Sequence, residues 1–410
     1  MDLSGMEDTI DLFQLQYSDL LQLSADEVSA SPAESRRLEL ISDQIMHEIG
    51  PNGPGLLSVI GVPKARLLRE ALLPLARKLA ILGNEDRKRI LKEYNLGSDV
   101  PLKNLDRIVS SFAMQMKYDQ EFNGKFCESI TAVADGSEFR NLGLAFQELG
   151  SCMMELGLLL SRVCDKKLGG CELEHSLLQC GTAKARLIHY HSILDNIIIK
   201  EKRRGKCRSA IDSRDSRIDD ESDLWQKWHY DYGIFTILTA PMFMFLDGTG
   251  SDAKEHDSPM GHTYLQILHP RKSRVLSVKA AEGSFIVQVG ESADVLSKGK
   301  LRATLHCVSR PAKIDDLSRE TFVVFLQPAW NKMFSLKEYP IEHSKKGDQN
   351  LESDCEGTGG AVNESVELIR NISGMVPPLS SRLKDGMTFA DFAKETTMKY
   401  YGSSGLQSSR

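Results

Sequence analysis

The sequence predicts a mainly β core, a sandwich or barrel of short strands, behind a shell of N-terminal helices. Two observations support this fold class. Up to residue 180, apolar residues recur at three- and four-residue spacing, the repeat of an amphipathic helix. After Gly181, short β-rich segments alternate with clusters of Gly, Asp, Ser and Lys, a spacing typical of all-β sandwiches and barrels.

The bulk composition excludes several classes of protein. The 410 residues are 41% hydrophobic and 26% charged, as expected for a globular chain. A net charge of −6 gives no general attraction for nucleic acid or anionic membranes. No run approaches the roughly 20 apolar residues of a membrane span, and the first residues lack the pattern of a secretory signal. We expect a monomer without nucleic-acid or membrane partners.

The cysteines indicate the compartment. Eight of them are spread along the chain without a C-x-x-C pair, so zinc binding is not indicated and reduced thiols are expected. We therefore expect a cytoplasmic protein. The basic run at 200–208 leaves the nucleus open as an alternative, because such runs also serve nuclear import.

Three segments predict helices within an N-terminal helical region, residues 1–180. Residues 38–49 have helical apolar spacing and end at a Gly-Pro stop. Residues 64–82 follow a proline and carry an apolar stripe. Residues 139–168 form the longest pattern, which Gly169 and the glycine after it close.

The core is predicted to span residues 181–335. Seven segments in it have the composition of strands: 185–190, 234–239, 263–268, 274–278, 284–289, 302–309 and 320–326. Residues 200–223 begin basic and end acidic with few apolar positions, which predicts a flexible insertion. Residues 336–410 are predicted to form a linker and a C-terminal extension. Its aromatic end, 383–401, should dock on the core and cap it.

His229-Tyr230-Asp231 carries the strongest chemical signal. On a strand, side chains two positions apart share one face, so this imidazole and this carboxylate would project together. With a second imidazole they would make the facial triad of non-haem Fe(II) oxygenases, which leaves positions open for substrates and oxygen. An isolated H-x-D occurs by chance in many proteins, so the assignment depends on what surrounds it.

The surrounding residues resemble the isopenicillin N synthase-like family of plant 2-oxoglutarate- and Fe(II)-dependent oxygenases. Residues 229–238, HYDYGIFTIL, resemble the family's H-T-D-x-G-x-x-T-x-L strand. Residues 287–291, VQVGE, resemble its V-N-x-G-D turn, and 296–300, LSKGK, resemble the L-S-N-G-x hairpin before the second histidine. Residues 319–321, RET, ahead of FLQP resemble R-x-S before F-x-x-P. The resemblance covers roughly residues 184–330.

This resemblance implies a site and a fold. It implies that Fe(II) is held by His229, Asp231 and His306. It also implies that Arg319 and Thr321 bind the distal carboxylate of 2-oxoglutarate, with Tyr190 near the cosubstrate. Arginine suits this role because its planar guanidinium pairs with a carboxylate through two parallel hydrogen bonds. The implied fold is a double-stranded β-helix, or jelly roll, with N-terminal helices and a C-terminal helical extension.

The implied activity is hydroxylation or desaturation of a small apolar metabolite. Such an enzyme consumes O2 and 2-oxoglutarate, releases succinate and CO2, and is expected to use ascorbate as reductant. No catalytic side chain is implied beyond the metal centre.

Two alternatives stay open. One is an Fe(II) oxidase of the same fold that uses ascorbate instead of 2-oxoglutarate. The other is a non-catalytic binding or regulatory protein that retains the fold. Ile188 and His191 favour it, because they stand where the family's N-Y-Y-P has asparagine and proline. The further histidines are expected to be structural or substrate-facing; they are His189, His191, His262 and His269.

Overall fold

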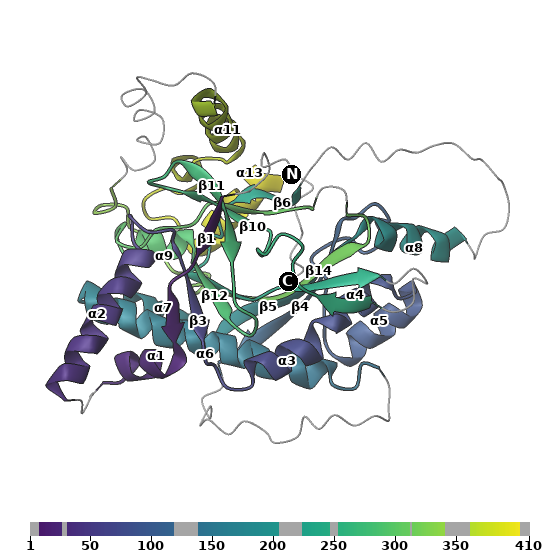
Figure 1. The fold of residues 1–410 in the computed structure, drawn as a ribbon. Helices are drawn as coiled ribbons and strands as arrows, with labels where there is room; N and C mark the ends of the chain where they lie inside the picture. Colours follow the sequence, from purple (N-terminus) through teal and green to yellow (C-terminus); the bar gives the residue numbers. More distant parts are fainter. Residues whose placement is uncertain are drawn as a thin grey trace.

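Two β-sheets face each other at the centre of the protein, and helices cover the outer face of the larger one (Figure 1). The computed structural model describes residues 8–26, 31–118, 138–204, 224–246, 253–311, 314–340 and 361–401. Within these ranges the sheets stay separate and form no closed barrel. No helix among the described residues is long and apolar enough to cross a membrane.

The smaller sheet has five strands. β11, β10, β13 and β6 pair antiparallel, and β1 adds to β11 in parallel. Their bounds, in sheet order, are β1 (Thr9–Asp11), β11 (Arg274–Lys279), β10 (Leu265–His269), β13 (His306–Ser309) and β6 (Leu224–His229).

The larger sheet has nine strands, and β14 lies near its middle between β7 and β5. Seven of them run in the order β2 (Gln14–Gln16), β3 (Leu56–Ile60), β12 (Phe285–Val289), β7 (Phe235–Thr239), β14 (Leu317–Leu326), β5 (Thr182–Tyr190) and β4 (Val109–Lys117). A hairpin of β8 (Met242–Leu246) and β9 (Ala253–His256) attaches to the start of β14.

The strand predictions are confirmed for all seven segments, each within a few residues except that β13 begins only at His306. The prediction of an N-terminal region built of helices was incomplete, because residues 1–180 also supply four strands, β1 to β4. β1 and β2 are three residues long, too short to show a period. Each is a strand only because a distant segment offers its backbone as partner.

The helices of the N-terminal region pack on the outer face of the larger sheet. Their bounds are α1 (Tyr17–Ser24), α2 (Pro32–Glu48), α3 (Ala65–Leu72), α4 (Pro74–Ile81), α5 (Asn84–Glu93), α6 (Leu142–Leu168) and α7 (Glu172–Cys180). The three predicted helices are confirmed, with one correction: 64–82 is two helices, interrupted at Leu73. Pro74 cannot donate a backbone hydrogen bond, which ends α3 and starts α4.

Helix α6 is the longest and lies directly on the sheet. Phe146 meets Phe322 of β14 edge to face, with ring centroids 4.8 Å apart. Gly157 permits this close approach, because a Cβ there would stand only 1.9 Å from Leu326 Cδ1. Apolar residues of both sheets form a second core between them, so the interior between the sheets is well packed.

Two predicted segments are described only in part. Helix α8 (Ile193–Arg204) extends into the insertion predicted at 200–223, whose start is therefore helical. Residues 205–223 lie outside the described residues. Of the linker and extension predicted at 336–410, residues 341–360 also lie outside them.

The C-terminal extension docks on the core, as predicted. Its helices are α11 (Ala361–Met375), α12 (Leu379–Arg382) and α13 (Phe389–Tyr401). Phe389 and Phe392 are fully buried in a cluster with Val295 of α9 (Glu291–Leu296). Arg382 makes a two-pronged ion pair with Glu291, with N–O distances of 2.5 and 2.7 Å, and neither side chain is more than 4% exposed.

Replacing Arg382 with methionine should destabilise the protein strongly. The change leaves the Glu291 carboxylate buried without its cation, which typically costs about 3–5 kcal/mol. Chemical denaturation would measure the free energy of unfolding. The double variant Arg382→Met/Glu291→Gln should recover part of the loss, and a single variant as stable as the wild type would contradict this account of the docking.

Candidate metal centre and anion clamp

The structure brings together the three residues predicted to hold iron. His229 is the last residue of β6, Asp231 follows two positions later, and His306 is the first residue of β13, directly opposite His229. Nε2 of His229 lies 3.7 Å from Asp231 Oδ1, and Nε2 of His306 lies 3.9 Å from Asp231 Oδ2. One ligand atom from each residue fits within 4.8 Å of the others. Two imidazoles and one carboxylate on one side of a site suit Fe(II).

Backbone contacts fix which nitrogen of each imidazole carries the proton. His229 Nδ1 donates to the carbonyl of Lys227 at 2.7 Å, and His306 Nδ1 donates to the carbonyl of Thr304 at 3.0 Å. Each ring therefore presents the lone pair of Nε2 toward Asp231, the arrangement that orients histidine ligands in metalloproteins. Burial and the neighbouring His229 lower the pKa of His306 to about 4, so its ring is neutral at neutral pH.

The Asp231 carboxylate is held from behind. Thr236 Oγ1 of β7 donates to Oδ2 at 2.6 Å. The loop carrying Asp231 is pinned by the turn after β12: Glu291 N donates to the Asp231 carbonyl at 2.8 Å. Gly290 is needed for this contact, because a Cβ there would stand 2.3 Å from the Gly233 carbonyl oxygen. The position of Asp231 thus depends on contacts from both sheets and the turn.

We expect Thr236→Val to weaken Fe(II) binding about tenfold, since partners that orient a metal ligand usually contribute on that scale. The hydroxyl is lost while the shape of the side chain is kept. Thr236→Ser, which keeps the hydroxyl, is the matched control and should bind Fe(II) like the wild type. Isothermal titration under anaerobic conditions would measure both, and equal affinity for the valine variant would contradict the role given to Thr236.

The three residues predicted to bind 2-oxoglutarate, here called the clamp, are Arg319, Thr321 and Tyr190. Arg319 and Thr321 are two positions apart on β14, and Tyr190 pairs with Arg319 across the strands. Arg319 Nε donates to the carbonyl of Thr263 at 2.9 Å, and its guanidinium lies 5.1 Å from the centre of the Tyr190 ring. The Thr321 hydroxyl is buried 3.4 Å from the hydroxyl of Thr239.

Arg319 is a buried cation without a matching anion in the part of the chain that the structure describes. It is 2% exposed, and burial lowers the pKa of its guanidinium. Among the described residues no carboxylate lies within ion-pair distance of it. An uncompensated buried charge is costly, so such a group is usually matched by a bound ion or substrate of opposite sign. The clamp therefore fits a carboxylate ligand.

Two glutamines contact the ligand triad, one of them also contacts the clamp, and the sequence did not reveal either role. Tyr190 OH donates to Gln226 Oε1 at 2.9 Å, and Gln226 Nε2 lies 3.0 Å from His229 Nε2. Gln288 Nε2 lies 2.8 Å from Nδ1 and 3.1 Å from Nε2 of His306, and 3.3 Å from Asp231 Oδ2. Because Nδ1 carries the proton donated to Thr304, the amide donates to Nε2 and to the carboxylate. Gln288 Oε1 is buried without a described partner, an acceptor left for a bound molecule.

No protein-family model matches the chain, and no curated protein matches its sequence. Solved structures match over most of the chain. One is a full-length Neurospora crassa protein in complex with α-KG and 5-formyluracil: 14% identity, 91% of this chain, 98% of that chain, TM-score 0.47. Another is JOX2 in complex with 2OG, Fe and JA: 15% identity, 82% of this chain, 80% of that chain, TM-score 0.48. A third is the dioxygenase for auxin oxidation from rice: 16% identity, 78% of this chain, 83% of that chain, TM-score 0.46. With so little identity, function is better judged from this protein's own site.

The remaining histidines lie outside the triad. His189 and His191 are completely buried on the helix-covered face of the larger sheet. His269 Nδ1 accepts hydrogen bonds from the backbone of the following turn, at Arg271 and Lys272. His262 Nδ1 accepts from the amide of Tyr264 at 3.1 Å. These contacts fit the first of the two roles expected for these histidines, which were structural or substrate-facing.

A cavity of about 490 Å³ lies beneath the C-terminal extension rather than at the triad. Tyr230, which alternates with the two ligands beside it, lines this cavity together with Leu305 and Leu383. None of the three triad residues or three clamp residues lines it. This cavity is therefore not where the triad and the clamp would meet a substrate.

Proposed function

We propose that this protein is an Fe(II)- and 2-oxoglutarate-dependent oxygenase that hydroxylates or desaturates a small, largely apolar metabolite. The proposal rests on one observation, that a possible metal site and a possible carboxylate site occur together in the interior of the protein. A two-histidine, one-carboxylate triad is linked through Gln226 and Tyr190 to a buried arginine that has no counter-ion among the described residues. A metal triad alone would fit many enzymes, and a buried arginine alone would fit many ligands. Together they fit a metal and a dicarboxylate.

The chain's own residues would bind and orient the reactants. His229, Asp231 and His306 would hold the metal from one side and leave the other side open. Arg319, with the hydroxyl of Thr321, would bind the carboxylate of 2-oxoglutarate that lies away from the metal. Bound Fe(II) supplies the reaction with O2, in which 2-oxoglutarate loses CO2 and becomes succinate. Burial of the site keeps bulk water away.

We also infer that the strands form a distorted double-stranded β-helix. Leaving aside the β8–β9 hairpin, the chain from β5 to β14 crosses between the sheets at every step except from β10 to β11: β5, β7, β12 and β14 belong to the larger sheet, and β6, β10, β11 and β13 to the smaller. All neighbours within each set of four are antiparallel. This order supports a jelly roll with residues 181–335 as its core and 336–410 as its extension. A cytoplasmic location and ascorbate as reductant remain part of the same proposal.

The non-catalytic alternative has one specific observation in its favour. The amide groups of Gln226 and Gln288 lie 3.0 and 3.1 Å from Nε2 of His229 and His306, and such contacts would suffice to hold both histidines in a purely structural role. The ascorbate-using oxidase differs in the clamp instead, because it has no need for a buried arginine facing the metal.

Turnover separates the three functions. The protein loaded with Fe(II), ascorbate and 2-oxoglutarate in air should release succinate, even slowly and without its proper substrate. Omission of 2-oxoglutarate should abolish the uptake of O2. Uptake that persists with ascorbate alone would indicate the oxidase, and no uptake under either condition, with no Fe(II) bound, would indicate the non-catalytic protein.

A further inference from the structure

We propose that His189, Glu320, Asp195 and Arg77 form a charge-balanced buried cluster that positions the clamp from behind the larger sheet. The proposal rests on the proposed function, because it concerns how the clamp binds 2-oxoglutarate. None of the four residues would touch the cosubstrate, so they are positioning residues.

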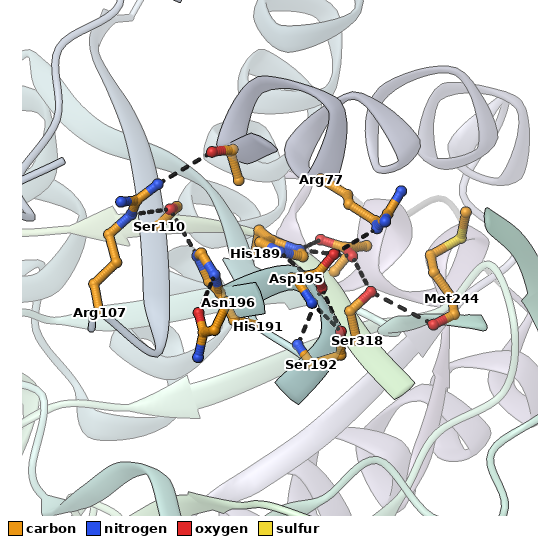
Figure 2. Close-up of polar contacts among 12 residues, drawn as sticks. Arg77, Arg107, Ser110, His189, His191, Ser192, Asp195, Asn196, Met244 and Ser318 are labelled. Carbon is orange, nitrogen blue, oxygen red and sulfur yellow. Dashed lines mark hydrogen bonds and ion pairs between the residues drawn. The ribbon is translucent and has the colours of Figure 1, made fainter. Parts of the chain in front are cut away.

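The cluster joins two strands and two helices (Figure 2). His189 of β5 faces Glu320 of β14 across the strands, and its Nδ1 lies 2.9 Å from both carboxylate oxygens. His189 Nε2 lies 3.4 Å from Oδ2 of Asp195, on α8, at ion-pair distance. Asp195 Oδ1 in turn accepts from Nε of Arg77, on α4, at 2.9 Å.

The cluster and the clamp are built on the same two strands. Glu320 lies between Arg319 and Thr321 on β14, and His189 lies next to Tyr190 on β5. Because successive side chains on a strand point to opposite faces, the cluster faces the helices and the clamp faces the smaller sheet. The contact that holds His189 against Glu320 therefore also fixes the register and spacing at which Tyr190 meets Arg319.

Complete burial makes the charge of the cluster matter. His189, Asp195 and Glu320 are 0% exposed and Arg77 is 3% exposed. Burial disfavours the protonated imidazole, but the carboxylates of Glu320 and Asp195 outweigh this and raise the pKa of His189 to about 9. His189 and Arg77 keep the pKa of Asp195 well below its usual range despite its burial. Arg77 and protonated His189 carry two positive charges, and Glu320 and Asp195 carry two negative charges. If the proton moves from His189 to Glu320, one charge of each sign is lost, so the cluster stays balanced.

The surroundings show that this is not a second reactive site. Ser318 Oγ donates to Glu320 Oε1 at 2.8 Å, and Ser192 donates to Asp195 Oδ2 through both its amide and its hydroxyl. The adjacent His191 lies 2.8 Å from Ser110 Oγ, and burial and the positive charge of His189 lower its pKa, so it stays neutral. No member of this group is exposed enough to meet a substrate.

The test compares His189→Gln with His189→Gln/Glu320→Gln. Affinity for 2-oxoglutarate would be read anaerobically from the visible band of the Fe(II) complex, alongside Fe(II) affinity and the melting temperature of the metal-free protein. The single variant leaves Glu320 without its cation, so the Kd of 2-oxoglutarate should rise about tenfold, the scale of coupling through packed networks. Fe(II) affinity should not change. The double variant restores the balance, with Asp195 paired to Arg77, and should return to within about threefold of the wild type.

A matched control separates positioning from simple destabilisation. Asp165 is a buried carboxylate remote from the clamp that accepts hydrogen bonds from the first turn of α7, at Leu173 N and Glu174 N. Asp165→Asn should lower the melting temperature and leave the Kd of 2-oxoglutarate unchanged. An equal rise in Kd for this variant would overturn the proposal.

A pH series supplies a second measurement, in which the wild type is compared with the double variant. The Kd of 2-oxoglutarate should stay constant up to about pH 8 and rise as the pH passes 9, where the cluster loses its shared proton and gains a negative charge. The double variant should lack this rise, although it keeps Arg319. A rise of the same size there, or an unchanged Kd in His189→Gln, would overturn the proposal while the proposed function stands. Absence of the band in the wild type would instead overturn both.

Discussion

Replacing Asp231 by alanine is expected to abolish Fe(II) binding and, with it, all succinate formation. Asp231 is the only carboxylate among the described residues that lies with both His229 and His306 in one ligand cluster. Its loss leaves only the two imidazoles and removes the negative charge that favours a divalent cation. We expect Fe(II) affinity to fall by at least about a hundredfold, more than the loss of a group that only orients a ligand. Anaerobic titration with Fe(II) measures this directly.

The control for Asp231→Ala is Asp257→Ala, which removes an exposed carboxylate away from the triad. It should bind Fe(II) like the wild type. The melting temperature of metal-free Asp257→Ala should stay close to that of the wild type, and that of Asp231→Ala should fall slightly, because Thr236 and Gln288 lose their acceptor. Retained Fe(II) affinity in Asp231→Ala would show that the metal is held elsewhere.

Replacing Arg319 by alanine should have the second largest effect, this time on the cosubstrate and not on the metal. Arg319 supplies the only cation of the clamp. Removing one partner of a buried ion pair typically costs about 3–5 kcal/mol, because the other charge is left buried and unpaired. That corresponds to a rise of at least about a hundredfold in the Kd of 2-oxoglutarate. Fe(II) affinity should remain within about twofold of the wild type, since the hydrogen bond of Arg319 goes to Thr263 and not to a ligand residue.

Arg319→Lys tests the geometry of the clamp. Lysine keeps the charge but not the planar pair of donors, so its Kd for 2-oxoglutarate should lie between those of the wild type and the alanine variant. The exposed Arg271→Ala serves as a control for loss of one positive charge. An unchanged Kd in Arg319→Ala would show that the clamp is misassigned and would favour the ascorbate-using alternative.

Local spacing predicts which neighbouring side chains share a face, whereas the roles given to these residues rest on the family resemblance. His229 and Asp231 are two positions apart, as are Arg319 and Thr321, so a strand period alone predicts that each pair shares a face. The second histidine could be placed only by resemblance, because its proximity depends on the pairing of β6 with β13. The structure places all of these residues between the two sheets.

Contacts between distant segments could not be predicted in the same way. Gln226 lies three positions from His229 on β6, but it meets Tyr190 only when the two sheets face each other. Gln288 of the larger sheet reaches His306 of the smaller sheet under the same condition. His189 pairs with Glu320 of β14, which is 131 positions away, and the other members of the cluster come from two helices. No local pattern indicates such pairing. β1 and β2 were missed for the same reason.

The anaerobic spectrum of the wild-type protein tests the central claim most directly. Fe(II) is added to the apoprotein without O2, and 2-oxoglutarate is then titrated while the visible spectrum is recorded. If His229, Asp231 and His306 hold Fe(II) opposite the clamp, a charge-transfer band of the chelated complex should grow and saturate at one equivalent, and Arg319→Ala should require far more 2-oxoglutarate to reach it. A protein that binds Fe(II) but shows no band at any concentration of 2-oxoglutarate would contradict the proposed function.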